Sequence, residues 1–161
     1  MYKNRILTIQ QIIQSENNFI TEYSEEKILL AAGKKIADFL YKNFKKKSVL
    51  FICGSGNNGN DGKFASRFLK GKIKHEIVVI SRQPINSDLD QLKIKICSHQ
   101  IIVDCLFGTG LKRDLSSEFI KIIKLINNSN KKIISIDIPS GIDGNTGEHY
   151  GAFIHASITL C

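Results

Sequence analysis

Short continuous apolar runs alternate with longer amphipathic stretches along this chain. A continuous run of this kind is typical of a strand that is buried on both faces of a sheet. Polar and turn-forming residues follow each run and limit its length. The pattern predicts strands at 49–53, 76–80, 101–103 and 133–136, and a last strand-like segment at 156–160.

The amphipathic stretches repeat their apolar residues at helical spacing. In the segment 24–44, for example, Ile28, Ala32 and Ile36 fall on one face. Because strands and helices alternate, we expect an α/β fold: a three-layer αβα, Rossmann-like domain with a mainly parallel sheet and helices on both faces. The predicted helices are 8–19, 24–44, 61–70 (capped by Gly71), 87–96 and 115–126.

Three polar loops follow predicted strands. Residues 54–62 read GSGNNGNDG, residues 104–114 begin with Asp104, and residues 137–141 read DIPSG. In an open parallel sheet the carboxyl ends of the strands share one edge, where such folds build ligand sites. We therefore expect the three loops to meet at one crevice.

The first loop satisfies the dinucleotide-binding pattern Gly54-x-Gly56-x-x-Gly59 between a strand and a helix. Its glycines permit close backbone approach, and the amides that open the next helix can bind an anion. The acidic residue that binds ribose in ordinary NAD dehydrogenases is missing, because that position falls at 80–82, Ile-Ser-Arg. A tight strand-to-helix turn, with asparagine in a left-handed conformation, remains the alternative.

The other two loops carry carboxylates at strand ends. Asp104 and Asp137 could together hold a cation, or divide into acid and base roles. Lys112 and Arg113 could neutralise a phosphate. The simpler alternatives are that each carboxylate caps a turn and that Asp114 caps the following helix.

Length and charge narrow the class of protein. The 161 residues fit one domain, and the net charge of +8 suits an anionic partner such as a nucleotide. The lysines are scattered, so we do not expect nucleic acid as a partner. The cysteines are widely spaced, which favours small buried side chains in a reducing compartment over a metal site. No leader pattern or membrane-spanning run is present, so we expect a cytoplasmic protein with no membrane partner.

Together these motifs resemble the YjeF N-terminal domain family, the NAD(P)H-hydrate epimerases. The family pattern is GxGNNGGDG, then VDxxFG, then DIPSG, and this chain has GSGNNGNDG at 54–62, VDCLFG at 103–108 and DIPSG at 137–141. The resemblance implies a Rossmann-like fold and an isomerase that interconverts the R and S forms of NADH or NADPH hydrated at C6. A non-catalytic nucleotide- or RNA-binding scaffold of the same fold is the alternative.

The resemblance also implies roles for individual residues. Asp137 would be the catalytic acid or base. One potassium ion per subunit would be held by Asn58, Asp104 and Ser140, whose hard oxygen ligands suit it. The substrate would be contacted by Asn57, Asn58, Gly59, Asn60, Asp61, Gly108, Thr109, Gly110, Leu111, Lys112, Arg113, Asp114 and Asp137.

Two departures from the family pattern stand out. Asn60 replaces a glycine, and asparagine tolerates the left-handed turn that we expect there. From the comparison with the family pattern we expect a single domain over 1–161, without the C-terminal strands of the family domain and without a fused dehydratase domain. Either the chain is cut short, the gene is eroded, or a partner covers the exposed sheet edge. The resemblance implies a homodimer and functional coupling to a separate dehydratase.

Overall fold

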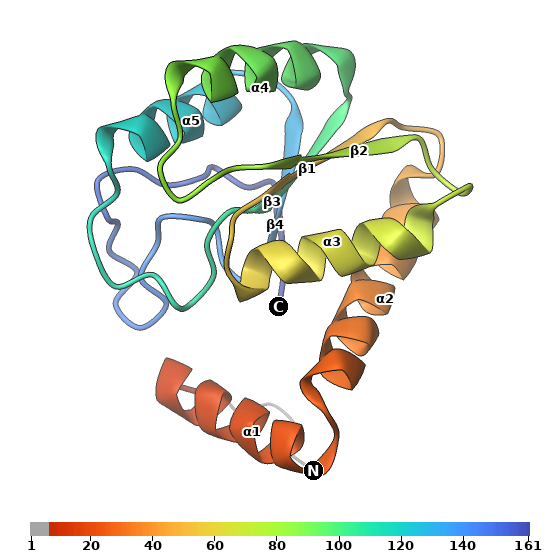
Figure 1. Ribbon diagram of the computed structural model, residues 1–161, viewed down its shortest axis with the longest axis vertical. Helices are drawn as coiled ribbons and strands as arrows, with labels where there is room; N and C mark the ends of the chain where they lie inside the picture. Colours follow the sequence, from red (N-terminus) through yellow and green to blue (C-terminus); the bar gives the residue numbers. More distant parts are fainter. Residues whose placement is uncertain (1–6) are drawn as a thin grey trace.

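The computed structural model describes residues 7–161, and its centre is one sheet of five parallel strands in the order β2-β1-β3-β4-β5 (Figure 1). The predicted α/β class and parallel sheet are confirmed. The strands are β1 (Val49–Cys53), β2 (His75–Val79), β3 (Ile101–Cys105), β4 (Lys132–Ile136) and β5 (Ile158–Leu160). The helices are α1 (Ile9–Glu22), α2 (Glu25–Phe44), α3 (Asn57–Leu69), α4 (Asn86–Ser98) and α5 (Ser117–Asn127).

Helices cover both faces of the sheet, as the sequence predicts. Successive residues of a strand point to opposite faces. Phe51 of β1 accordingly packs in a core with α2 and α3, whereas its neighbour Ile52 packs in a second core with α4 and α5. Figure 1 shows the two helix pairs on opposite sides of the strands. All residues of β1 and β3 are buried, which explains their uninterrupted apolar sequences.

The strand order reverses between β1 and β3. The chain passes from β1 to its neighbour β2, and then crosses back to form β3 on the other side of β1. The loops after β1 and β3 therefore diverge to opposite faces and leave a crevice at the carboxyl edge. Residues 54–56 and 106–113 border that crevice.

Helix α1 lies apart from the three layers and continues through a short link into α2 (Figure 1). Thr8 caps it: the Thr8 hydroxyl accepts from the Gln11 amide, and the Gln11 side chain accepts from the Thr8 amide. Ile9 anchors its first turn, because its amide donates to Asn145 Oδ1 over 3.2 Å and its side chain is buried. Within residues 7–161, no helix is long and apolar enough to cross a membrane.

Two helix starts differ from the prediction. Helix α3 begins at Asn57 rather than at residue 61, so the asparagines form its first turn and only 54–56 remain as loop. Asn60 consequently has ordinary helical geometry, and the expected left-handed turn there is wrong. Helix α5 is capped by Ser116, whose Oγ accepts from the Phe119 amide, so Asp114 is not its cap.

Close backbone contacts hold the crevice loops in place. A Cβ atom on Gly54 would lie 2.0 Å from the Leu106 carbonyl oxygen, and one on Gly59 would lie 2.0 Å from the Gly54 carbonyl oxygen. On the helix surface, a Cβ on Gly62 would lie 2.7 Å from Cys105 Sγ. These glycines are therefore required by packing between the loop after β3, the end of β1 and α3.

We expect Gly54→Ala to lower the free energy of unfolding by about 2–3 kcal/mol, because two main-chain segments must separate to admit the new methyl group. Urea titration followed by circular dichroism measures the loss. Gly110→Ala is the matched control, since a Cβ at Gly110 meets no atom within 4 Å. Equal stability of the two variants would contradict the packing role.

Candidate active site

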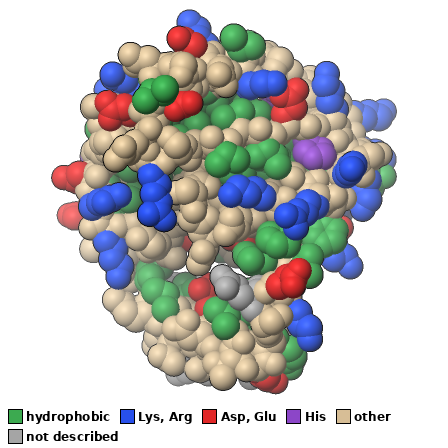
Figure 2. All heavy atoms as spheres, viewed as in Figure 1, with side chains coloured by type: hydrophobic (Ala, Val, Ile, Leu, Met, Phe, Trp, Pro, Cys, Tyr) green, Lys and Arg blue, Asp and Glu red, His purple; other side chains and the backbone are tan. Residues whose placement is uncertain are grey.

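A large cavity of about 1550 Å³ opens at the carboxyl edge of the sheet. The loops after β1, β3 and β4 and the end of β5 form one wall, and α1 with much of α2 forms the other. Figure 2 shows the cleft as a hollow between the layered body and the part that contains α1. Its volume is ample for a dinucleotide.

Beneath the cavity floor, Asp104 is a fully buried carboxylate. Its Oδ1 accepts from Ser140 Oγ at 2.6 Å and from the Leu106 amide at 3.2 Å. Its Oδ2 accepts from Ser135 Oγ at 2.7 Å and from the Ser140 amide at 3.0 Å. Burial raises the pKa of Asp104, while these hydrogen bonds oppose the rise. The carboxylate ties the ends of β3 and β4 to both following loops.

Two of the three residues predicted to bind a cation, Asn58 and Ser140, contact the main-chain carbonyl of Phe107, and the third, Asp104, is joined to Ser140. Asn58 Nδ2 donates to that oxygen over 2.8 Å, and Ser140 Oγ lies 3.0 Å from it, while the same hydroxyl bonds Asp104. Asn58 is only 7% exposed, and its Oδ1 finds no hydrogen-bond partner among the described residues. A buried acceptor without a partner normally indicates a missing donor or cation. The structure therefore links Asn58, Asp104 and Ser140 through oxygen atoms, which are the ligands that a hard cation prefers.

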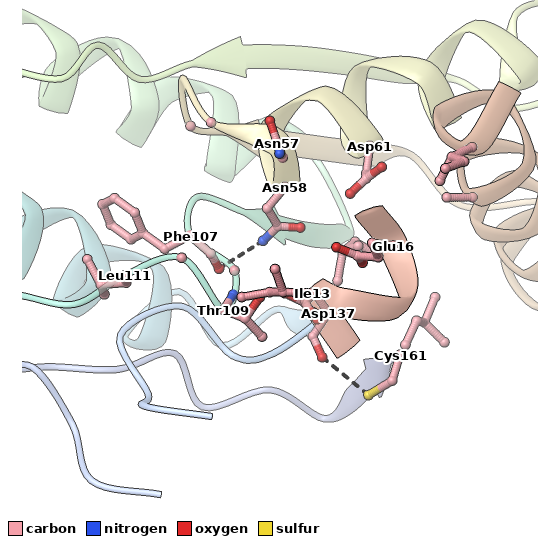
Figure 3. A pocket seen from close by; sticks show the side chains of 18 of the residues that line it. Ile13, Glu16, Asn57, Asn58, Asp61, Phe107, Thr109, Leu111, Asp137 and Cys161 are labelled. Atoms are coloured by element: carbon pink, nitrogen blue, oxygen red, sulfur yellow. Dashed lines mark hydrogen bonds between the residues drawn. The ribbon is translucent and has the colours of Figure 1, made fainter. Parts of the chain in front are cut away.

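Asp137 stands at the end of β4 with an unusual backbone. Its φ of 67° lies in the left-handed region, which an aspartate adopts at a cost. Asp137 Oδ2 accepts from the Thr109 amide at 2.9 Å, and a Cβ on Gly108 would lie only 2.5 Å from that oxygen. The loop after β3 thus holds the Asp137 carboxylate at the cavity wall (Figure 3).

Two further carboxylates face the same space. Figure 3 shows the carboxyl groups of Asp61 from α3 and Glu16 from α1 beside each other, near Asp137. Burial, then repulsion from Asp137 and Glu16, raises the pKa of Asp61 to about 6. Burial, then Asp137, also raises the pKa of Glu16. Asp61 can therefore carry a proton close to neutral pH, as a general acid must.

Most of the predicted substrate residues line this cavity, and three do not. Gly59 is buried against Gly54, Asn60 faces Lys63, whose Nζ donates to its Oδ1 over 3.3 Å, and Asp114 lies outside the lining. The residues that the structure does bring to the cavity are Asn57, Asn58, Asp61, Gly108, Thr109, Gly110, Leu111, Lys112, Arg113 and Asp137.

The wall formed by α1 was not predicted as part of the site. Glu16 and Ile13 line the cavity from α1, yet α1 carries no motif that marks it as functional. The Thr8–Gln11 capping box could have fixed where α1 begins. Nothing local in the sequence could have placed the helix over the ends of the strands.

The cysteines divide into two pairs. Cys53 and Cys105 are buried neighbours on β1 and β3, and burial raises the pKa of the Cys105 thiol, so both are small core side chains as expected. Cys97 and Cys161 are exposed, so the expectation of burial is wrong for them. No group of three or more His, Cys, Asp or Glu residues suited to a metal occurs in the described part of the chain.

The family described as YjeF-related protein N-terminus matches residues 25–100 and 81–161. The chain belongs to this family. A crystal structure of the yeast protein ynu0 has the same fold, with a TM-score of 0.76 at 20% identity, covering 97% of this chain and 79% of that one.

Two curated relatives of this YjeF-related chain carry names that specify an activity. The bifunctional NAD(P)H-hydrate repair enzyme Nnr of Dictyoglomus turgidum is 34% identical over 97% of this chain and 35% of its own length. The NAD(P)H-hydrate epimerase of Oenococcus oeni is 32% identical over 84% of this chain and 71% of its own length. The chain spans about a third of the first relative.

We expect Asp61→Asn to stabilise the protein at high pH. The folded state raises the pKa of Asp61 to about 6, so folding favours the protonated carboxyl group. The contribution of Asp61 to the free energy of unfolding is therefore fully present below about pH 4, and it is lost as the pH rises through about 6. The variant avoids that loss and should be more stable by about 1–2 kcal/mol at pH 7.5, after allowing for solvent in the cavity.

Urea titrations at pH 4.5 and pH 7.5 measure this difference. Asp90→Asn, on the exposed side of α4, is the matched control. A gain for Asp61→Asn that is the same at both pH values would contradict the raised pKa.

Proposed function

We propose that this protein is an NAD(P)H-hydrate epimerase, which interconverts the R and S forms of NADH or NADPH hydrated at C6 of the nicotinamide ring. The observation that carries the proposal is the meeting of Asp61 and Asp137 in a cavity that also presents the glycine-rich helix start. Membership of the YjeF-related family and relatives named as epimerases support it.

The cavity suits a dinucleotide in both charge and shape. Helix α3 begins at the cavity with Gly56 as its cap and no capping side chain, so its first amides are available to a phosphate. Lys112 and Arg113 add positive charge from the loop after β3. The carboxylates lie at the α1 side, where the nicotinamide ring would be placed.

Two carboxylates can perform the epimerisation by removing and replacing the C6 hydroxyl group. Asp61 gives its proton to the hydroxyl as the C6–O bond breaks, which releases water and leaves a planar C6=N1 iminium cation. Asp137 takes a proton from the water that adds to the opposite face of C6. The proton returns from Asp137 to Asp61 through solvent, so atoms and charge balance over the cycle. Positioned acids and bases of this kind contribute about 10²–10⁴-fold each.

Asn58, Asp104 and Ser140 would hold the potassium ion. The orphaned Asn58 Oδ1 and the all-oxygen donor set around the Phe107 carbonyl fit a hard monovalent cation. When bound, the ion would supply a fixed positive charge below the cavity floor. The chain's own contribution there is to keep the loop after β3, and with it the Thr109 amide, against Asp137.

The proposed product is the S form, which a separate dehydratase would consume. A bifunctional name for the Dictyoglomus turgidum relative supports this coupling. A homodimer remains part of the proposal. We do not favour the scaffold alternative, because a scaffold needs neither the left-handed Asp137 backbone nor an unpaired buried amide oxygen at a cavity.

We expect Asp137→Asn to lower kcat for epimerisation by about 10²–10⁴-fold, since the amide cannot accept a proton from water. Asparagine tolerates the left-handed backbone, so the variant should fold. The measurement follows equilibration of R and S hydrated NADH by proton NMR. Asp90→Asn is the matched control, and an Asp137→Asn protein as fast as the wild type would remove the assigned role.

We expect potassium to raise the midpoint of thermal unfolding by about 3–5 °C at about tenfold its Kd, relative to choline at equal ionic strength. Asn58→Ala should abolish the difference, because it removes the orphaned oxygen. Asn57→Ala is the control, since Asn57 is exposed in the same helical turn. A potassium effect that survives Asn58→Ala would rule out this site.

A further inference from the structure

Arg82 lines the cavity from the segment that follows β2. It follows β2 by three positions, and the Ile80 amide donates to the Cys53 carbonyl over 2.8 Å, which keeps the end of β2 beside the end of β1. Arg82 Nε donates to Ser55 Oγ over 3.3 Å. The guanidinium is thereby tethered to the glycine-rich loop.

The end of β2 has a defined task in dinucleotide-binding folds of this type. An acidic residue there accepts hydrogen bonds from the ribose hydroxyls of NAD, whereas an arginine accommodates the 2′-phosphate of NADP. This chain has no acidic residue in the segment 80–83, which reads ISRQ. The ribose hydroxyls of an NADH derivative would find no carboxylate here.

The guanidinium group of Arg82 has hydrogen-bond donors that are not used within the described part of the chain. Within residues 7–161 its one side-chain hydrogen bond uses Nε, and it forms no ion pair with a carboxylate. The two terminal nitrogens therefore remain available for a bidentate contact with a phosphate dianion. The Ser55 hydroxyl, exposed beside it, can donate to the same phosphate.

The pyrophosphate has another place in the same cavity. Gly56 leaves the first amides of α3 without a capping side chain, and Lys112 and Arg113 lie on the wall formed by the loop after β3. Arg82 is thus not needed for the phosphates common to NADH and NADPH. An additional phosphate, present in only one of them, would use it.

We propose that Arg82 and Ser55 bind the 2′-phosphate of the adenosine ribose, so that the chain prefers hydrated NADPH to hydrated NADH. This assignment rests on the proposed function for the identity of the substrate. It makes Arg82 a specificity-determining residue rather than a catalytic one. A single partly exposed arginine–phosphate contact supports a preference of about tenfold.

The test compares kcat/KM for the two hydrated cofactors at low ionic strength. We expect the wild type to favour hydrated NADPH by about tenfold, and Arg82→Gln to remove that preference while changing the value for hydrated NADH less than about twofold. Arg82→Asp should reverse the preference, because a carboxylate accepts from ribose hydroxyls and repels the phosphate. Arg67→Gln is the matched control, since Arg67 lies outside the cavity lining.

An equal fall for both substrates in Arg82→Gln would overturn the proposal and assign Arg82 to the pyrophosphate. An unchanged ratio would overturn it as well. If the wild type epimerises neither substrate, the proposed function fails, and calorimetry with adenosine 2′,5′-bisphosphate and 5′-ADP still decides the site. Tighter binding of the 2′,5′-bisphosphate that is lost in Arg82→Gln supports it, and equal affinities contradict it.

Discussion

The buried carboxylate of Asp104 is the constraint on which this molecule depends. A charge with no exposure to solvent is tolerated only where hydrogen bonds surround it, and here four donors from Leu106, Ser135 and Ser140 do so. Those donors belong to β4 and to the loops after β3 and β4. The same network therefore fixes the position of both loops relative to the sheet. Because the two loops form part of the cavity wall, the network also determines the shape of that wall.

Glycine distribution adds a second constraint of the same kind. The loop after β3 lies against Gly54, and the first turn of α3 lies against the carbonyl of Gly54 in turn. Gly108 leaves room for the Asp137 carboxylate at the point where the Thr109 amide binds it. The residues proposed to take part in the reaction and the residues required by close packing thus lie in the same short segments, which is why these motifs are rich in glycine and asparagine.

The sequence was sufficient for the sheet and for the convergence of the three loops. Continuous apolar runs such as 49–53 identify buried parallel strands, and parallel strands bring their carboxyl ends to one edge. The position of α1 depends on long-range contacts such as Ile9 with Asn145, which no local pattern encodes. The first turn of α3 was missed because asparagine and glycine are poor helix formers, yet packing against Gly54 overrides that propensity.

The left-handed backbone of Asp137 has a consequence for how this protein responds to selection. Glycine would relieve the local strain at that position, at a gain of about 1 kcal/mol or more, and would also delete the carboxylate. A screen that selects only for the yield of folded protein would therefore favour replacement of Asp137, the residue on which turnover is proposed to depend. If variants descended from one parent sequence keep aspartate at this position despite the cost in stability, that retention indicates selection for function.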